Sequence, residues 1–307
     1  TVGYKVSINT GGSDVMGVIR KDDDGDTTHV ELLNAGENAP IGVALTYRVA
    51  GPEPKEVALS FLNADGEVVR RYSSEDEAKE QPRLMRLKTE PGVHRFVWNM
   101  RYPDATRLEN TALSLYWGGS TVGPVAAPGK YQARLEIDGQ EWTQEFEIVR
   151  DPRITATDDD LRAQFELLIE VRDKLGQVHD LVKRSRSLRE QISAWESRLN
   201  DAGNADLANE AERVREQLLE AENNLVESRS RGAADSFNYP PKVNSKLASL
   251  QSTVSYGDSR PPEQTREVFA MLSQQADDGI AALQQMIDRE VAQLNQKLAE
   301  SGVPAIG

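Results

Sequence analysis

The chain has 307 residues and a formal net charge of -14 at pH 7, so it repels the phosphates of nucleic acids and of anionic membrane surfaces, and we expect neither as a partner. It contains no cysteine, which excludes disulfides, thiol catalysis and cysteine-ligated zinc. None of its apolar runs approaches the roughly 18 residues that a membrane span needs.

Residues 1–27 are expected to form a linker or extension. The chain starts at Thr1 without a methionine and with no visible signal peptide, so we interpret it as a processed product or a fragment of a longer protein. The stretch KDDDGDTTHVE at 21–31 resembles a calcium loop, but placing Gly25 at position 6 of an EF-hand loop puts Arg20 where the first carboxylate belongs. We therefore predict a solvated acidic turn here and no metal site.

Residues 28–152 have the pattern of a β domain. Asp65-Gly66 and Asp138-Gly139 each lie between apolar-rich runs, which predicts two hairpins with type I′ turns, because both central residues of that turn need positive φ. Short alternating runs predict strands near 28–33, 42–49, 55–62, 67–72, 83–88, 93–99, 130–137 and 141–149. Seven or eight short strands at this spacing indicate an Ig-like β-sandwich, with an open barrel as the alternative.

The stretch GVHRFVWNMRYPDA at 92–105 concentrates polar groups in a way that suggests the corner of an active site. Within it, the apolar Phe96 and Trp98 alternate with Arg95 and Val97. That alternation is typical of a half-buried strand. We therefore interpret the polar cluster as the solvent-facing side of a strand.

The three histidines, His29, His94 and His179, lie on separate predicted elements without HxxxH or HxH spacing. A histidine metal site would need ligands from distant segments and is not expected. His179 lies beside the apolar seam of a predicted helix, and we interpret it as a surface or flank residue.

The segment 102–128 is a loop between two predicted strands and is longer than most strand connections. It carries Tyr116 and Trp117, which are the candidate ligand or partner contacts, because long loops on β folds often bind sugars or proteins. The alternative is that Trp117 packs onto the sandwich or onto the neighbouring domain. In the same loop, Asp104 and Glu109 are the least unfavourable carboxylates for glycoside hydrolysis.

Motifs that carry strong catalytic signals are missing from the sequence. No GxSxG elbow, SxxK helix start, P-loop or GxGxxG pattern occurs. We therefore assign no catalytic, cofactor-binding or metal-binding residue and expect no cofactor.

Residues 155–302 change to a helical period. Thr157, followed three residues later by Asp160, marks the start of the first helix. Apolar residues at three- and four-residue steps then predict four helices of about 42, 27, 15 and 40 residues, of which the longest spans ~63 Å at ~1.5 Å per residue. The two shorter helices together match one long helix. We therefore predict an elongated antiparallel helical bundle or coiled coil of three arms, the middle one broken at 231–241.

The order of several segments resembles that of a known family. The segments are GENAPIGVALTYRV, LSFLNADGEVVRRYSS, GVHRFVWNMRYPDA, LYWGGSTVGPVAAPGKYQARLEIDGQEWTQEFEIVRDPRIT, TDDDLRAQFELLIEVRDKL and EVFAMLSQQADDGIAALQQMIDREVAQLNQKLAESGVPAI. Together they resemble the C-terminal region of large bacterial sortilin-like proteins, which carry BNR/Asp-box β-propellers and are often labelled glycosyl hydrolases. The resemblance extends over nearly the whole chain from about Gly36 onward.

This resemblance implies a FlgD-like Ig domain, a helical C-terminal appendage, and export to the bacterial periplasm or cell exterior. It places the propeller before this chain, because the Asp-box pattern SxDxGxTW is absent here, and it makes residues 1–27 the exit from that propeller. No catalytic residue is carried over, since any hydrolase activity would belong to the missing part.

The expected function is that of a non-catalytic accessory region, which positions, tethers or oligomerises a larger exported protein. Its expected partner is another protein or its own propeller, with a homo-oligomer through the helices as a further expectation. One alternative is a glycan- or peptide-binding module that uses the loop 102–128. A second is part of a glycoside hydrolase whose catalytic residues lie outside this chain.

Overall fold

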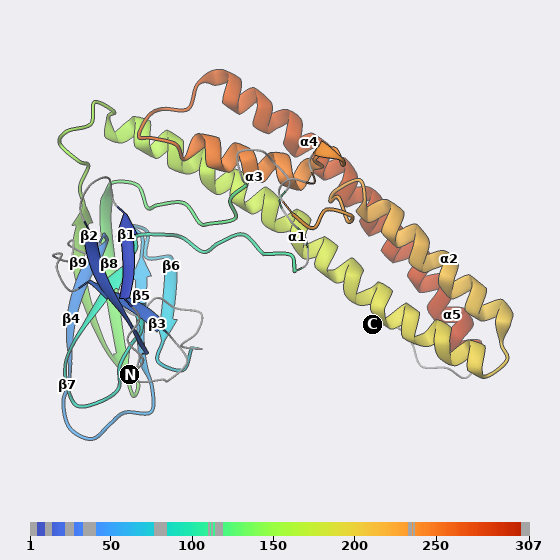
Figure 1. Ribbon diagram of the computed structural model, residues 1–307, viewed down its shortest axis with the longest axis horizontal. Helices are drawn as coiled ribbons and strands as arrows, with labels where there is room; N and C mark the ends of the chain where they lie inside the picture. The colour runs from blue at the N-terminus through green and yellow to red at the C-terminus, as the bar shows by residue number, and fades with distance from the viewer. Residues whose placement is uncertain are drawn as a thin grey trace. The chain divides into compact units, whose positions relative to one another are not determined.

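The computed structural model describes residues 41–76, 85–109, 111, 113, 119–232, 235 and 237–301, together with the backbone of three strands before residue 33 (Figure 1). The fold is α+β, with sheets in the N-terminal half and helices in the C-terminal half. The chain divides into two compact units. The sheet unit comprises Thr1–Met100 and Tyr131–Phe146, and the helical unit comprises Arg101–Lys130 and Glu147–Gly307.

The first three strands form a sheet of their own. They are β1 (Lys5–Asn9), β2 (Asp14–Lys21) and β3 (Thr28–Leu32), paired antiparallel in the order β1-β2-β3. Residues 1–27, which the sequence predicts to be a linker or extension, therefore contain two strands. The Gly11-Gly12 pair between β1 and β2 is a turn signal of the kind that predicts hairpins elsewhere in the chain.

Six further strands form two sheets. Strands β4 (Val43–Val49) and β7 (Gly92–Trp98) pair antiparallel, and β5 (Val57–Leu62), β6 (Val68–Ser73), β8 (Gly129–Ile137) and β9 (Gln140–Ile148) form a sheet in the order β6-β5-β8-β9. These elements confirm the strands predicted for this region, with one exception.

The exception is the strand predicted at 83–88, because residues 85–88 have no strand conformation. The hydroxyl of Tyr47 accepts a hydrogen bond from the Lys88 amide at 2.7 Å and donates one to the Lys88 carbonyl at 3.1 Å. The Tyr47 side chain thus forms the two hydrogen bonds with the Lys88 backbone that a neighbouring strand would otherwise form. Met85 and Leu87 are each only 8% exposed, so their alternation reflects burial of an irregular segment.

Aromatic side chains join the two sheets into one core. The ring of Trp98 in β7 stacks on that of Phe61 in β5, with 4.2 Å between centroids, and Phe146 of β9 meets both rings edge-on. Phe96 and Trp98 are fully buried, which confirms the apolar face predicted for this strand. Val97 is buried as well. The alternation places it on the solvent-facing side, so the prediction is wrong for this residue.

The two Asp-Gly pairs make different turns. Asp138 and Gly139 have φ of 48° and 80° and connect β8 directly to β9, which confirms the type I′ turn. In the other hairpin only Gly66 has a positive φ. The Asn63 side chain accepts hydrogen bonds from the backbone amides of Asp65 and Glu67, and it widens the connection from β5 to β6.

The helical unit has three arms. Its helices are α1 (Asp158–Asp201), α2 (Ala205–Glu222), α3 (Val243–Val254), α4 (Glu263–Met286) and α5 (Ala292–Glu300), with a π-helical segment η4 (Ile287–Val291) between the last two. Helix α1 has 44 residues and starts at a complete capping box of Thr157 and Asp160, as predicted.

Ion pairs show how the arms run. Helix α2 is antiparallel to α1, whereas α4 is parallel to α1, and α2 with α3 makes the middle arm (Figure 1). The pairs are Arg186–Glu222 and Arg215–Glu196 between α1 and α2, Lys174–Asp277 between α1 and α4, Arg213–Glu290 between α2 and η4, and Lys297–Glu210 between α5 and α2. The break in the middle arm spans residues 223–242 and is wider than the predicted 231–241.

The π-helical segment keeps one apolar face in register. Leu283, Ile287 and Val291 are all buried, although two successive four-residue steps rotate away from a common face in an α-helix of 3.6 residues per turn. A π turn closes i→i+5 hydrogen bonds and holds more residues, so it returns Val291 to the core side.

Candidate functional site

The long loop between β7 and β8 belongs to the helical unit. We call residues 101–130 the strap, since its described residues lie along α1 and α3. The predicted contacts Tyr116 and Trp117 lie outside the described residues of this segment. The flanking parts show what the loop does.

The first described part of the strap, residues 101–109, is called the outgoing leg. It forms hydrogen bonds with successive turns of α1. Arg172 donates a hydrogen bond to the Pro103 carbonyl at 3.1 Å. Two turns further along the helix, His179 Nδ1 lies 2.6 Å from the Thr106 carbonyl oxygen, and the Thr106 hydroxyl donates to Asp180 at 2.5 Å. The strap thus binds α1 through its own backbone carbonyls.

His179 is only 1% exposed, so its predicted place at the surface is wrong. A carbonyl oxygen can only accept, and therefore Nδ1 carries the proton and donates to Thr106. Nε2 is then free to accept from the amide of Asn244 in α3, 3.4 Å away. Burial lowers the pKa of His179, and the nearby charge of Arg186 lowers it further. The neutral imidazole thus connects the strap to two helices.

The last part of the strap, residues 119–130, is called the return leg, and it forms hydrogen bonds with α3. The amide of Ser120 donates to the Ala248 carbonyl at 3.1 Å, and the Gln251 side chain donates to the Val122 carbonyl. Within the strap, Arg101 donates to the Gly123 carbonyl at 2.8 Å. Both legs are therefore held by hydrogen bonds to backbone carbonyls.

Of the two predicted carboxylates, Asp104 has structural partners for its side chain, whereas Glu109 contributes its backbone carbonyl. The Asp104 carboxylate accepts from Arg107 at 2.8 Å and from the Gly123 amide at 2.9 Å, and so joins the two legs. The Glu109 carbonyl accepts from Arg186 at 3.1 Å.

A buried ion cluster lies behind the strap. The Glu222 carboxylate is fully buried and accepts from Arg186 and Arg189, each at 2.8 Å. Arg186 also donates to the Thr111 hydroxyl at 2.8 Å. One guanidinium therefore connects α1, α2 and the strap, and this cluster had no signal in the sequence beyond the basic run KRSRSLR.

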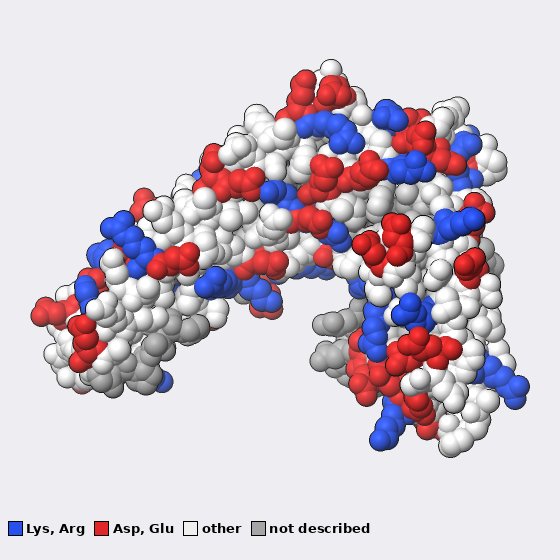
Figure 2. Space-filling model, turned by 180° about the vertical axis from the view of Figure 1, so that it is seen from behind, with Lys and Arg blue, Asp and Glu red and all other residues white. Residues whose placement is uncertain are grey.

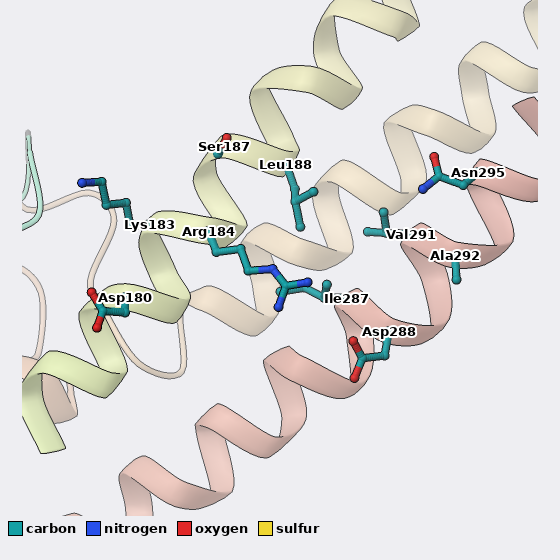
Figure 3. Close-up of a pocket in the computed structure, with 10 residues that line it drawn as sticks. All are labelled: Asp180, Lys183, Arg184, Ser187, Leu188, Ile287, Asp288, Val291, Ala292 and Asn295. Carbon is teal, nitrogen blue, oxygen red and sulfur yellow. The ribbon is translucent and has the colours of Figure 1, made fainter. Parts of the chain in front are cut away.

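Beyond the strap, an open groove of about 610 Å³ lies between α1 and η4. Leu188, Ile287 and Val291 lie at its base and are only 6%, 4% and 5% exposed. Its lining residues are Asp180, Lys183, Arg184, Ser187, Leu188, Ile287, Asp288, Val291, Ala292 and Asn295. Figure 3 shows Arg184 and Leu188 extending from α1 toward Ile287, whereas Lys183 points away from that space. This groove is the candidate interaction site.

The electrostatics of the groove differ from those of the surface around it. Figure 2 shows acidic and basic side chains interleaved along the described helical unit on the face in view. The helices of this unit form several ion pairs, Lys174–Asp277, Arg213–Glu210 and Lys297–Glu210 among them. Within the described part of the chain, no ion pair or hydrogen bond is formed by the exposed Arg184. The groove thus holds Arg184 together with the carboxylates of Asp180 and Asp288.

The described residues contain no group of three or more histidine, cysteine, aspartate or glutamate side chains that could hold a metal ion. In the stretch 92–105, His94 is half-buried and its Nε2 lies 2.6 Å from the Glu90 carbonyl. His29 and the acidic stretch 22–27 lie outside the described side chains. Among the helices that are described, none has both the length and the apolarity to cross a membrane.

Fold and site together define an α+β protein in which a long strand connection is fastened to a three-armed helical unit. No family model, no curated protein and no solved structure matches the chain.

Proposed function

We propose that this chain is a non-catalytic accessory region of a larger exported β-propeller protein, and that it positions or tethers the propeller. In this proposal the sheet unit is an Ig-like sandwich, and the helical unit carries an interaction surface. The proposed location is the bacterial periplasm or the cell exterior.

The observation that carries the proposal is the strap. The polar groups that the sequence offers for chemistry, Asp104 and His179, hold the strap in place, and so does Arg186. The chain also crosses between its two units three times, after residues 100, 130 and 146. Polar groups fixed in this way favour a structural module over a site that must admit and release a substrate.

Oligomerisation through the helices needs a surface other than the apolar seam. Leu283 and Ile287, the centre of that seam, are 0% and 4% exposed within a single chain. Self-association would therefore use exposed positions such as Met271, which is 53% exposed. We keep tethering as the primary proposal for this reason.

Two experiments test the proposal. The coding region upstream of Thr1 should encode Asp-box repeats and an export signal, and an upstream region without a propeller would overturn the proposal. The purified chain should also leave glycoside and peptide substrates intact. Turnover that is lost when Asp104 is changed to Asn would instead place catalysis within this chain and overturn the accessory role.

A further inference from the structure

Asn244 places a buried amide against the imidazole of His179. Both side chains are 1% exposed, and they come from α3 and α1. Nδ1 of His179 donates to the Thr106 carbonyl, so the unprotonated Nε2 can only accept, and it faces Nδ2 of Asn244 at 3.4 Å. That distance is longer than in most hydrogen bonds of proteins. The link from His179 to α3 is therefore a weak neutral hydrogen bond.

The other polar atom of the same amide has no partner. Among the described residues, nothing donates a hydrogen bond to Oδ1 of Asn244, although this oxygen is shut off from solvent. A buried acceptor without a donor is unfavourable, and folded proteins contain few of them. The oxygen and nitrogen of a carboxamide are nearly equal in size, so a half-turn of the amide exchanges them without repacking. Asn244 therefore has an unused acceptor next to His179.

The charges around this pair are already matched. The charged groups near His179 and its neighbours are Arg186 and Asp180 on α1, Arg107 and Asp104 on the strap, and Glu222 on α2. Burial has the largest effect on the pKa of His179 and lowers it, Arg186 lowers it further, and Asp180 raises it. Each carboxylate has a partner, since Asp104 binds Arg107, Glu222 binds Arg186, and Asp180 accepts from the Thr106 hydroxyl. This leaves Oδ1 of Asn244 as the unpaired acceptor at the ring.

We infer that His179 and Asn244 form a proton-dependent switch, in which the Asn244 carboxamide turns and presents Oδ1 when Nε2 takes up a proton. Both ring nitrogens of the imidazolium then donate, Nδ1 to the Thr106 carbonyl and Nε2 to Oδ1. A hydrogen bond from a charged donor is stronger than a neutral one, so the exchange offsets part of the cost of burying the cation. The strap, α1 and α3 therefore stay joined in both protonation states. This property is independent of the proposed accessory function.

Nuclear magnetic resonance of the full chain tests the switch, with histidine rings and asparagine side-chain amides labelled with ¹⁵N. The signals of His179 and Asn244 are assigned by their loss in His179→Gln and Asn244→Asp. From about pH 7.5 to about pH 5, the Asn244 amide signals should shift with the same midpoint as the His179 ring, because one event moves both groups. Circular dichroism at 222 nm on the same samples should show that the chain remains folded.

The sign of the change in Asn244→Leu distinguishes a turning amide from a fixed one. If the amide turns, the variant removes the acceptor of the imidazolium, and the proton affinity of His179 should fall about ten-fold, the scale of one hydrogen bond to a charged group. If the amide is fixed, the variant removes only the donor to the neutral ring. The proton affinity would then rise, and the inference would be overturned.

Gln251→Leu is the matched control. Gln251 is a buried amide about two turns further along α3, it donates to the Val122 carbonyl of the strap, and its Oε1 also lacks a partner among the described residues. Its loss should leave the titration midpoint of His179 unchanged, and an equal fall in both leucine variants would assign the effect to a loosened strap.

Two results on the wild type alone would also overturn the switch, so it stays testable if Asn244→Leu does not fold. One is that the Asn244 amide signals stay in place while the His179 ring titrates. The other is that the ring takes up no proton until the chain unfolds.

Discussion

At the scale of single residues, the buried polar groups set the conditions under which the helical unit is stable. His179 is surrounded by the Thr106 carbonyl, the Asn244 amide, and the charges of Arg186 and Asp180. Its environment favours the neutral form because burial penalises the imidazolium. Protonation therefore competes with folding.

We expect stability to fall in mild acid through this residue. The folded-state pKa of His179 lies below the unfolded value of 6.5, so the unfolded state binds more protons as the pH falls. The contribution is fully present above about pH 6.5 and is lost progressively below it, by at most about 1.4 kcal/mol per pH unit. Urea unfolding at pH 7.5, 6.5 and 5.5 should show this loss in the wild type but not in His179→Gln.

The carboxylates titrate lower, which separates their effect from that of His179. Hydrogen bonds to Arg213 and Lys297 lower the pKa of Glu210 to about 2, and the Thr157 backbone with Arg260 lowers that of Asp160 to about 2. Their stabilisation is present above their unfolded pKa values, near 4, and is lost below them. An equal slope in His179→Gln between pH 7.5 and 5.5 would contradict the assignment.

Glu222 gives a second prediction at this scale. Glu222→Gln leaves Arg186 and Arg189 without their buried anion, and we expect the free energy of unfolding to fall by about 3 kcal/mol. Glu220→Gln, at an exposed position of the same helix, should change it by less than about 0.5 kcal/mol. Urea denaturation of both variants measures the difference, and similar values for the two would contradict the role of the cluster.

At the scale of elements, the sequence predicts those features whose geometry depends only on neighbouring residues. Asp138-Gly139 makes its turn with its own two residues, so the type I′ turn could be predicted, whereas Asn63 widens the other hairpin through a side-chain hydrogen bond. The π turn does have a signal in the sequence, the two four-residue steps from Leu283 to Val291. The burial of His179 could not be predicted, because the residue that covers it lies 73 positions earlier in the chain.

Substitutions at two helical glycines distinguish the effect of helix propensity on stability from the effect of packing. In α4, a Cβ on Gly279 would lie 2.6 Å from Cδ2 of Leu225, whereas a Cβ on Gly176 in α1 meets no atom within 4 Å. Gly279→Ala should therefore destabilise the chain by about 1–3 kcal/mol through overpacking, despite the better helix propensity of alanine. Gly176→Ala should stabilise it by up to about 1 kcal/mol. Thermal unfolding followed at 222 nm decides between these signs.

At the scale of the whole molecule, the sequence predicts the α+β division but not the assignment of the strap. The boundary predicted between residues 152 and 155 follows the change of hydrophobic period. The strap is a β-loop by position, but Ala105, Leu108 and Leu113 pack against the apolar core of the helices. Contacts between segments so far apart in the sequence leave no periodic pattern from which they could be predicted.

The strap should therefore be required for helical stability. Ala105→Asp places an unpaired charge where the side chain is 4% exposed, and we expect the midpoint of thermal unfolding at 222 nm to fall by several degrees. Arg107→Ala in the same leg, at an exposed side chain, should shift it little. Unchanged helical melting in Ala105→Asp would show that the strap is dispensable.

The strap also constrains the order in which the protein can assemble. It is synthesised before any helix, yet the side chain that donates a hydrogen bond to the Val122 carbonyl lies 129 residues later, at Gln251 in α3. Closing contacts over such separations carries a large loop entropy and slows folding. During translation, Ala105, Leu108 and Leu113 therefore have no apolar surface to cover them until most of the chain has left the ribosome, and this interval is when the nascent protein is most exposed to aggregation or to a chaperone.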